Sequence, residues 1–95
     1  MLSPNQNLQG KRILVTGASS GIGNAIAVAC ANAGAIVIST GRNRDALDSL
    51  ITSLDGDGHS YIVADITYTT ERDRLVQSIT PVDGVLHAAG IGQTL

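Results

Sequence analysis

The fold is decided by Thr16-Gly17-Ala18-Ser19-Ser20-Gly21-Ile22-Gly23, a stretch with three glycines in the spacing G-x-x-x-G-x-G. It follows the apolar run Ile13-Leu14-Val15 and opens an Ala-rich segment that ends at Ala33. An apolar run without alternation predicts a strand that is buried on both faces. The Ala-rich segment predicts a helix over residues 21–33. The stretch is therefore interpreted as the turn between a strand and a helix.

Each glycine of this turn has a physical role. Gly17 lets the chain leave the strand sharply, with a positive φ. Gly21 leaves no side chain between the backbone and a bound phosphate, and Gly23 lets the helix pack close to the strand. The first N–H groups of the helix are unpaired and carry a partial positive charge, which favours an anion. The sequence therefore predicts a site for the pyrophosphate of a nucleotide.

The rest of the chain alternates apolar runs with segments of helical spacing. Residues 1–9 are polar and are expected to form an arm, and residues 10–95 are expected to form one partial domain. Further strands are expected at 35–39, 60–64 and 82–87, and further helices from 43 or 44 to 54 and over 67–79. Large apolar side chains are expected to face inward in two helices, namely Ile22, Ile26 and Cys30 in the first and Leu75, Val76 and Ile79 in the third.

The element order βαβαβαβ predicts an α/β fold, a partial doubly wound parallel sheet of the Rossmann type. Right-handed crossovers lay the strands in the order 3-2-1-4 and put the first two helices on one face of the sheet. The third helix then lies on the other face, and the sheet switches direction between strands one and four. Ligands of such sheets bind at this switch point, beyond the carboxyl ends of the strands. The glycine turn begins at the same point.

Composition excludes several other kinds of site. The 95 residues carry a net charge of −2 and no Phe or Trp, so neither a basic block nor an aromatic platform indicates nucleic acid. No apolar stretch approaches the roughly 18 residues of a membrane span, and no ligand cluster predicts a metal site. The N-terminus lacks the pattern of a signal peptide. The single cysteine, Cys30, suits a core position in a reducing compartment and a cytoplasmic protein, and His59 is expected to be exposed.

Four segments follow the four expected strands in order: residues 16–23, Gly41-Arg42, Asp65-Ile66 and Ala88-Ala89-Gly90. Together they resemble the short-chain dehydrogenase/reductase family over about residues 10–92. The resemblance implies that this part binds NAD or NADP. It also implies that the complete protein transfers hydride to or from a small carbonyl or alcohol substrate and forms a homo-oligomer. The family's catalytic residues are a Tyr-x-x-x-Lys pair with a Ser and usually an Asn.

That catalytic set has no counterpart in this chain. The only lysine, Lys11, precedes the first strand, and Arg72 stands where a lysine would follow Tyr68. An arginine stays charged and does not relay protons. The chain is therefore expected to be the N-terminal part of a longer enzyme, without catalytic residues of its own and inactive alone. Its apolar fourth strand is expected to be covered by the rest of the chain, a separate segment or another copy.

The resemblance assigns cofactor contacts to residues near the carboxyl ends of the strands. Ser19 and Ser20 are either ordinary turn residues or ligands of phosphate and ribose. Asp65 either caps the third helix or accepts a hydrogen bond from the adenine amino group, with the Ile66 N–H on the ring. His87 is expected to act through its backbone. The predicted set comprises Gly17, Ser19, Ser20, Gly21, Ile22, Gly23, Gly41, Arg42, Asp65, Ile66, His87, Ala88, Ala89 and Gly90, with Thr16 stabilising the turn.

The end of the second strand distinguishes the two cofactors. Proteins that bind NAD in this way place an acidic residue there for the ribose hydroxyls, whereas this chain has Gly41 followed by Arg42. Gly41 removes the carboxylate that would repel a 2′-phosphate. Arg42 is either a solvated loop residue or a planar set of donors for that phosphate, and the second interpretation favours NADP(H) over NAD(H). The competing function is a nucleotide-binding sensor or interaction module without turnover, and a methyltransferase would need the missing acid.

Overall fold

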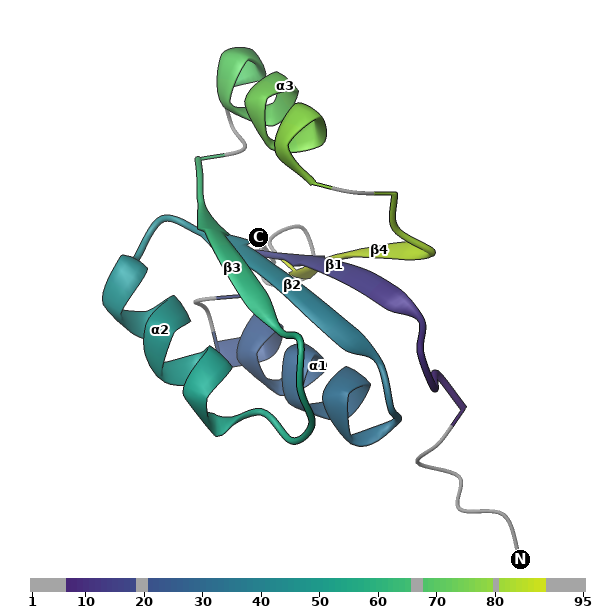
Figure 1. Ribbon diagram of the computed structural model, residues 1–95. Helices are drawn as coiled ribbons and strands as arrows, with labels where there is room; N and C mark the ends of the chain where they lie inside the picture. The colour runs from purple at the N-terminus through teal and green to yellow at the C-terminus, as the bar shows by residue number, and fades with distance from the viewer. Residues whose placement is uncertain (1–6, 19–20, 66–67, 80, 89–95) are drawn as a thin grey trace, which may run out of the picture.

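The computed structural model describes residues 7–18, 21–65, 68–79 and 81–88. Within these residues strands and helices alternate (Figure 1), namely β1 (Arg12–Thr16), α1 (Gly21–Asn32), β2 (Ile36–Gly41), α2 (Arg44–Ser53), β3 (Ser60–Val63), α3 (Thr69–Ser78) and β4 (Gly84–His87). Every predicted element is confirmed, with small differences at its ends. One difference concerns the site, because β2 continues to Gly41. That glycine is therefore the last residue of the strand rather than the first residue after it.

The four strands form one parallel sheet in the order β3-β2-β1-β4, which confirms the predicted topology. The central strand β1 pairs with β2 on one side and with β4 on the other. Thr16, the last residue of β1, is level with Thr40 of β2 and with His87 of β4. The carboxyl ends of these three strands therefore meet at one edge of the sheet. The switch in strand order lies there, between β1 and β4.

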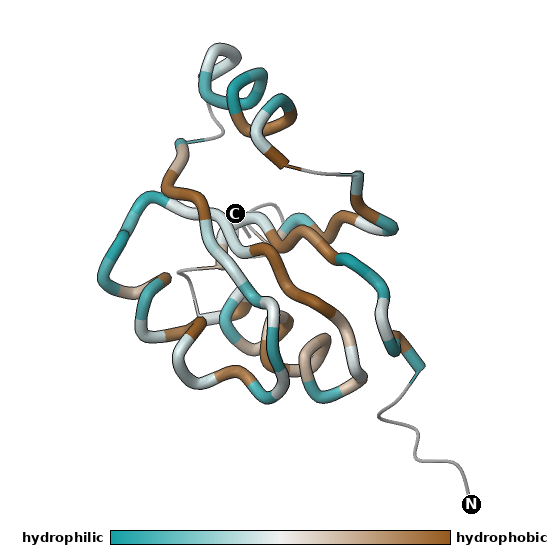
Figure 2. Tube along the Cα trace, viewed as in Figure 1, coloured by the Kyte–Doolittle hydropathy of each residue, from teal (hydrophilic) through white to brown (hydrophobic). Residues whose placement is uncertain are grey.

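The larger core lies between the sheet and helices α1 and α2, which cover the same face (Figure 1). Its strand residues include Ile13 and Val15 of β1 and Val37 of β2, and α2 contributes Leu47 and Leu50. Figure 2 shows the hydrophobic stretches of β1 and β2 side by side at the centre of the sheet. Burial of both central strands on both faces explains why their sequences show no alternation.

Helix α1 places two of its three predicted apolar residues at the core, since Cys30 is buried and Ile26 packs against the larger core. Its buried residues are Gly23, Ala27, Cys30 and Ala31, whereas Ile22 is 43% exposed. The prediction that Ile22 packs inward is wrong. The helix is oriented with Gly23 against the glycine turn that precedes it. Ile22, the residue before Gly23, therefore points outward. Cys30 is a core residue as predicted, and burial raises the pKa of its thiol.

The opposite face of the sheet has a smaller core. Leu14, Ile38 and Leu75 form it, and Leu75 is the only buried residue of α3. Val76 was predicted to face inward and is instead 68% exposed, because α3 stands away from the sheet (Figure 1). In the described part of the chain β4 pairs with β1 alone, and its apolar side chains Val85 and Leu86 are exposed. What covers the other side of β4 stays a prediction.

His59 is half-buried, so the prediction that it is exposed is wrong. Its Nδ1 accepts a hydrogen bond from the N–H of Val37 at 3.0 Å, and its Nε2 lies 2.6 Å from the carbonyl oxygen of Asp55. Val37 is fully buried, and a buried N–H needs a partner. The imidazole therefore joins the turn after α2 to the start of β2.

The residues before β1 pack against the turn between α1 and β2. The N–H of Leu8 donates to the carbonyl of Ala33 at 2.8 Å. The N–H of Gly10 donates to the carbonyl of Gly34 at 3.1 Å. The Leu8 side chain also packs against the larger core. Residues 1–6 of the expected arm lie outside the described residues. The division between arm and domain therefore stays a prediction.

Ser39 of β2 carries the one buried side-chain oxygen that has no hydrogen-bond partner among the described residues. A buried, unpaired hydroxyl costs folding free energy, so Ser39→Ala is expected to raise the free energy of unfolding by about 1 kcal/mol. Thr40→Val is the matched control, because the neighbouring Thr40 hydroxyl donates to the carbonyl of Ile62 at 2.7 Å. Thr40→Val is expected to lower the free energy of unfolding by about 1 kcal/mol. Urea unfolding measures both, and a destabilised Ser39→Ala protein would contradict the prediction.

Candidate nucleotide-binding site

The glycine turn leaves β1 as predicted. Gly17 has a φ of +71°, a backbone conformation that glycine adopts without strain. The next residue, Ala18, is fully buried, and its N–H donates to the carbonyl of Thr40 at 3.0 Å. The turn therefore crosses the carboxyl end of β2 before it reaches α1. Ser19 and Ser20 lie outside the described residues.

The start of α1 contains two glycines in opposite surroundings. A Cβ at Gly23 would overlap the carbonyl oxygen of Gly17 and lie 2.8 Å from the Cα of Ala18, so only glycine fits there. The close contact predicted for Gly23 is confirmed, but it is made to the turn rather than to the strand. A Cβ at Gly21 would meet no atom of the described residues within 4 Å. Gly21 therefore borders open space at the helix N-terminus, where a phosphate would approach the backbone.

Side chains join β1 to β4 at the switch point. The Oγ1 of buried Thr16 lies 3.0 Å from Nδ1 of His87 and 3.4 Å from the carbonyl oxygen of Leu86. Thr16 directly precedes Gly17, so this contact fixes the point from which the turn departs. The predicted role of Thr16 is in the turn, and its partner His87 was not predicted from the sequence. The signal that could have found the pair is that each residue ends one of two neighbouring strands.

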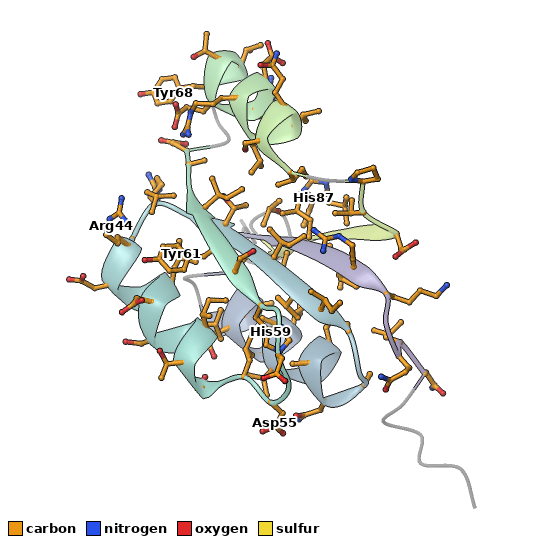
Figure 3. All side chains as sticks on the ribbon, in the orientation of Figure 1. Arg44, Asp55, His59, Tyr61, Tyr68 and His87 are labelled. Atoms are coloured by element: carbon orange, nitrogen blue, oxygen red, sulfur yellow. The ribbon has the colours of Figure 1, made fainter. Side chains whose placement is uncertain are left out.

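The end of β2 places two arginines beside the turn. Gly41 is buried, whereas Arg42 and Arg44 are exposed on either side of Asn43. The Asn43 side chain caps α2 by accepting a hydrogen bond from the N–H of Ala46 at 3.0 Å. An open depression of about 550 Å³ is lined by Arg42, Asn43, Arg44 and Asp45. Figure 3 shows Arg44 at the start of α2, pointing away from the sheet.

Asp65 follows β3 at the same edge. The N-cap residue of α3 is Tyr68, so the alternative in which Asp65 caps that helix is wrong. The Asp65 N–H donates to Oε1 of Glu71 at 3.3 Å, and the Asp65 carbonyl accepts from the N–H of Tyr68 at 3.2 Å. The hydrogen bond from the Arg74 side chain has the largest effect in lowering the pKa of Glu71, and the hydrogen bond from the Asp65 N–H has the next largest. Ile66 lies outside the described residues.

All of the predicted cofactor residues that the structure describes gather at the carboxyl edge of the sheet. Ala88 continues from β4 and is buried, whereas Ala89 and Gly90 lie outside the described residues. The predicted residues brought to this edge are Gly17, Gly21, Ile22, Gly23, Gly41, Arg42, Asp65, His87 and Ala88. The edge offers open backbone at α1 and cationic side chains at α2, an arrangement that can bind an elongated anion.

Two other kinds of site are absent from the described residues. His, Cys, Asp and Glu side chains form no group of three or more that could hold a metal ion in residues 7–18, 21–65, 68–79 and 81–88. The described helices are also too short and too polar for any of them to cross a membrane.

Comparison with known proteins identifies what this arrangement is similar to. A family model described as short chain dehydrogenase matches residues 11–95. A 2-keto-3-deoxy-L-fuconate dehydrogenase of Xanthomonas campestris is 40% identical over 88 residues, which are 93% of this chain and 29% of that protein. An uncharacterised oxidoreductase of Staphylococcus aureus is 38% identical over 87 residues, 87% of this chain and 38% of that protein. The chain thus spans well under half the length of these relatives.

Solved structures give the same result. A putative short chain dehydrogenase from Escherichia coli CFT073, complexed with NADPH, superposes with a TM-score of 0.75 at 34% identity. The match covers 90% of this chain and 39% of that one. The NADP active-site complex of Pseudomonas aeruginosa RhlG superposes with a TM-score of 0.78 at 32% identity, over 90% of this chain and 37% of that one.

Proposed function

The chain belongs to the short-chain dehydrogenase family, and from this we propose that it is the cofactor-binding part of an oxidoreductase that uses NADP(H). The complete protein transfers hydride between this cofactor and a small carbonyl or alcohol substrate. Two solved relatives are bound to NADPH and NADP, which supports this class of cofactor. The comparisons give no support to the alternative, a nucleotide sensor or interaction module without turnover.

One observation carries the proposal, namely the open backbone at the N-terminus of α1 beside a turn in which only glycine fits at Gly23. The empty space at Gly21 fits a pyrophosphate, which the first N–H groups of the helix would hold. Bound there, the cofactor supplies a nicotinamide ring that gives or accepts a hydride. We propose that Asp65 contacts the adenosine half, together with Ser19, Ser20 and Ile66, which lie outside the described residues. Ala88, Ala89, Gly90 and the His87 backbone are proposed to line the path of the cofactor along β4.

The residues of this chain bind and orient the cofactor, while proton transfer to the substrate falls to residues elsewhere. Lys11 precedes β1, at the opposite edge of the sheet, and Tyr68 begins α3, followed at the fourth position by Arg72. Neither is placed to donate a proton beside the carboxyl ends of β1 and β4. Inactivity of residues 1–95 alone stays a prediction. We further propose that the complete protein is a homo-oligomer and that it is cytoplasmic, and the free thiol of Cys30 supports the second of these proposals.

Arg42 is expected to select NADPH over NADH. Arg42 is exposed at the end of β2, and Gly41 beside it presents no carboxylate. A charge-assisted hydrogen bond contributes roughly 1.5–3 kcal/mol, so Arg42→Ala should weaken NADPH binding about ten- to a hundredfold and leave NADH binding nearly unchanged. Calorimetry on the complete protein measures both affinities.

Lys11→Ala is the matched control, because it removes one positive charge from the amino end of the sheet. It should change neither affinity. Equal affinity of the unmodified protein for NADPH and NADH, unaltered by Arg42→Ala, would refute the proposed preference for NADP(H).

A further inference from the structure

The end of β3 is held by two side chains that come from α3. Oε1 of Glu71 accepts a hydrogen bond from the Asp65 N–H at 3.3 Å. The guanidinium group of Arg74 donates to the same Oε1 at 3.1 Å and to the carbonyl of Val63, the last residue of β3, also at 3.1 Å. The ion pair on α3 therefore engages the backbone both before Asp65 and at Asp65 itself.

These contacts fix the direction in which the Asp65 side chain leaves the backbone. Glu71 holds the Asp65 N–H, and the Asp65 carbonyl accepts from the N–H of Tyr68 at 3.2 Å. Both peptide planes that flank the Asp65 Cα are thereby held, and rotation of these planes is the only soft motion of the backbone there. The N–H of Ala64 donates to the carbonyl of Gly41 at 2.8 Å, which joins the same segment to the end of β2. The position of the Asp65 Cβ at the carboxyl edge of the sheet therefore depends on Glu71.

The stability of α3 does not by itself explain where the Glu71 carboxylate lies. An acidic residue in the first turn is favoured by the helix dipole without any particular hydrogen bond. A glutamate at this place in a helix typically accepts from the N–H of the cap residue, which is Tyr68 here. That N–H is engaged with Asp65, and the Glu71 carboxylate reaches past the cap to the Asp65 N–H. The hydrogen bonds from Arg74 and then from Asp65 lower the pKa of Glu71, so the acceptor is charged at neutral pH.

We propose that Glu71 is a positioning residue for the cofactor, which holds the Asp65 backbone so that the Asp65 carboxylate meets the adenine amino group. This inference rests on the proposed function, in which Asp65 contacts the adenosine half. Glu71 acts through Asp65 and does not itself contact the cofactor, while Arg74 holds Glu71 in place. A carboxylate aimed at the amino group favours adenine over a base that lacks this group. The selectivity for the base is therefore expected to depend on a residue of α3.

The test compares NADPH with an analogue whose base is purine, in which a hydrogen replaces the amino group of adenine. Calorimetry on the complete protein gives both affinities for the unmodified protein and for its variants. The unmodified protein is expected to bind NADPH about tenfold more tightly than the analogue, which corresponds to one charge-assisted hydrogen bond. Asp65→Ala should abolish this preference. Glu71→Ala should reduce it to about threefold or less by weakening the binding of NADPH, with the affinity for the analogue nearly unchanged.

Three further variants distinguish positioning from a general effect on the fold. Glu71→Gln keeps an oxygen that accepts from the Asp65 N–H, so it should retain most of the preference. Arg74→Met removes the donors that hold Glu71 and should lower the preference part of the way. Asp73→Ala is the matched control, because Asp73 is exposed on the same helix and its side chain has no hydrogen bond or ion pair with the described residues. It should bind both ligands as the unmodified protein does. Exposed ion pairs contribute little to stability, so circular dichroism should show all variants folded.

The outcomes separate this inference from the proposed function. If Asp65→Ala abolishes the preference while Glu71→Ala leaves it intact, the role of Glu71 is refuted and the contact of Asp65 with the cofactor stands. If Glu71→Ala weakens the binding of both ligands equally, Glu71 supports only the fold and the inference is again refuted. A preference that survives in Asp65→Ala would refute both the inference and the proposed contact of Asp65. An unmodified protein that binds neither ligand would refute the proposed function itself.

Discussion

Replacement of Gly21 by valine is expected to leave the protein folded and to weaken its binding of NADPH by about a hundredfold or more. Gly21 is exposed and has no positive φ, and in the part of the chain that the structure describes a Cβ there would meet no atom within 4 Å. The free protein therefore has room for the branched side chain. In the complex, the same side chain would occupy the space in which the pyrophosphate meets the N-terminus of α1. Fluorescence titration with NADPH measures the loss.

Gly21→Ala serves as the graded control, because a single methyl group fills less of the same space. It should bind NADPH with an affinity between those of the unmodified protein and of Gly21→Val. The far-ultraviolet circular dichroism of all three proteins should agree. A folded Gly21→Val protein that binds NADPH as tightly as the unmodified one would show that the glycine turn is not the phosphate site.

At Gly23, two residues further on, even a methyl group is expected to damage the fold. Its Cβ would overlap the carbonyl oxygen of Gly17 and lie 2.7 Å from the carbonyl carbon. These are backbone atoms at the end of the central strand, so they have no rotamer with which to move aside. Gly23→Ala is therefore expected to lower the free energy of unfolding by about 3 kcal/mol, at the upper end of overpacking costs. Urea unfolding followed by circular dichroism measures the change.

Gly21→Ala is again the matched control, since it makes the same substitution in the same helix where there is space. It should leave the free energy of unfolding unchanged or slightly raise it, because alanine favours helices more than glycine does. If Gly23→Ala unfolds at the same urea concentration as the control, α1 does not depend on its close approach to the turn.

The sequence predicted the architecture because two strong rules govern it. Glycines mark the turn after β1, and right-handed crossovers put α1 and α2 on one face of a sheet whose strands step outward from β1 to β2 to β3. Helix orientation was harder to predict. Periodicity identifies the apolar positions of α1, but the contact of Gly23 with the Gly17 carbonyl decides which of them face the core. Ile22 is exposed for that reason. Val76 is exposed because α3 stands away from the sheet (Figure 1), and spacing along a helix carries no information about that position.

The parts of the candidate site that depend on backbone conformation could be predicted from the sequence. The parts that depend on which side chains meet could not. Gly17 has the positive φ expected of the motif, and Gly23 has a close contact, although it is made to the turn rather than to the strand. The contact between Thr16 and His87 depends on the register of two strands that are far apart in the sequence. The contact of Glu71 with the turn after β3 likewise depends on where α3 lies.

The two hydrogen bonds of His59 have a consequence for the proton on its ring. The N–H of Val37 can only donate and the carbonyl of Asp55 can only accept, so Nδ1 is the bare nitrogen and Nε2 carries the hydrogen. The imidazole is thus restricted to a single neutral tautomer by backbone groups whose roles cannot be exchanged. At the other edge of the sheet, His87 faces the hydroxyl of Thr16, which donates or accepts as it rotates and leaves both tautomers open. Of the two imidazoles, only the one beside the glycine turn is free to change the nitrogen that carries its hydrogen.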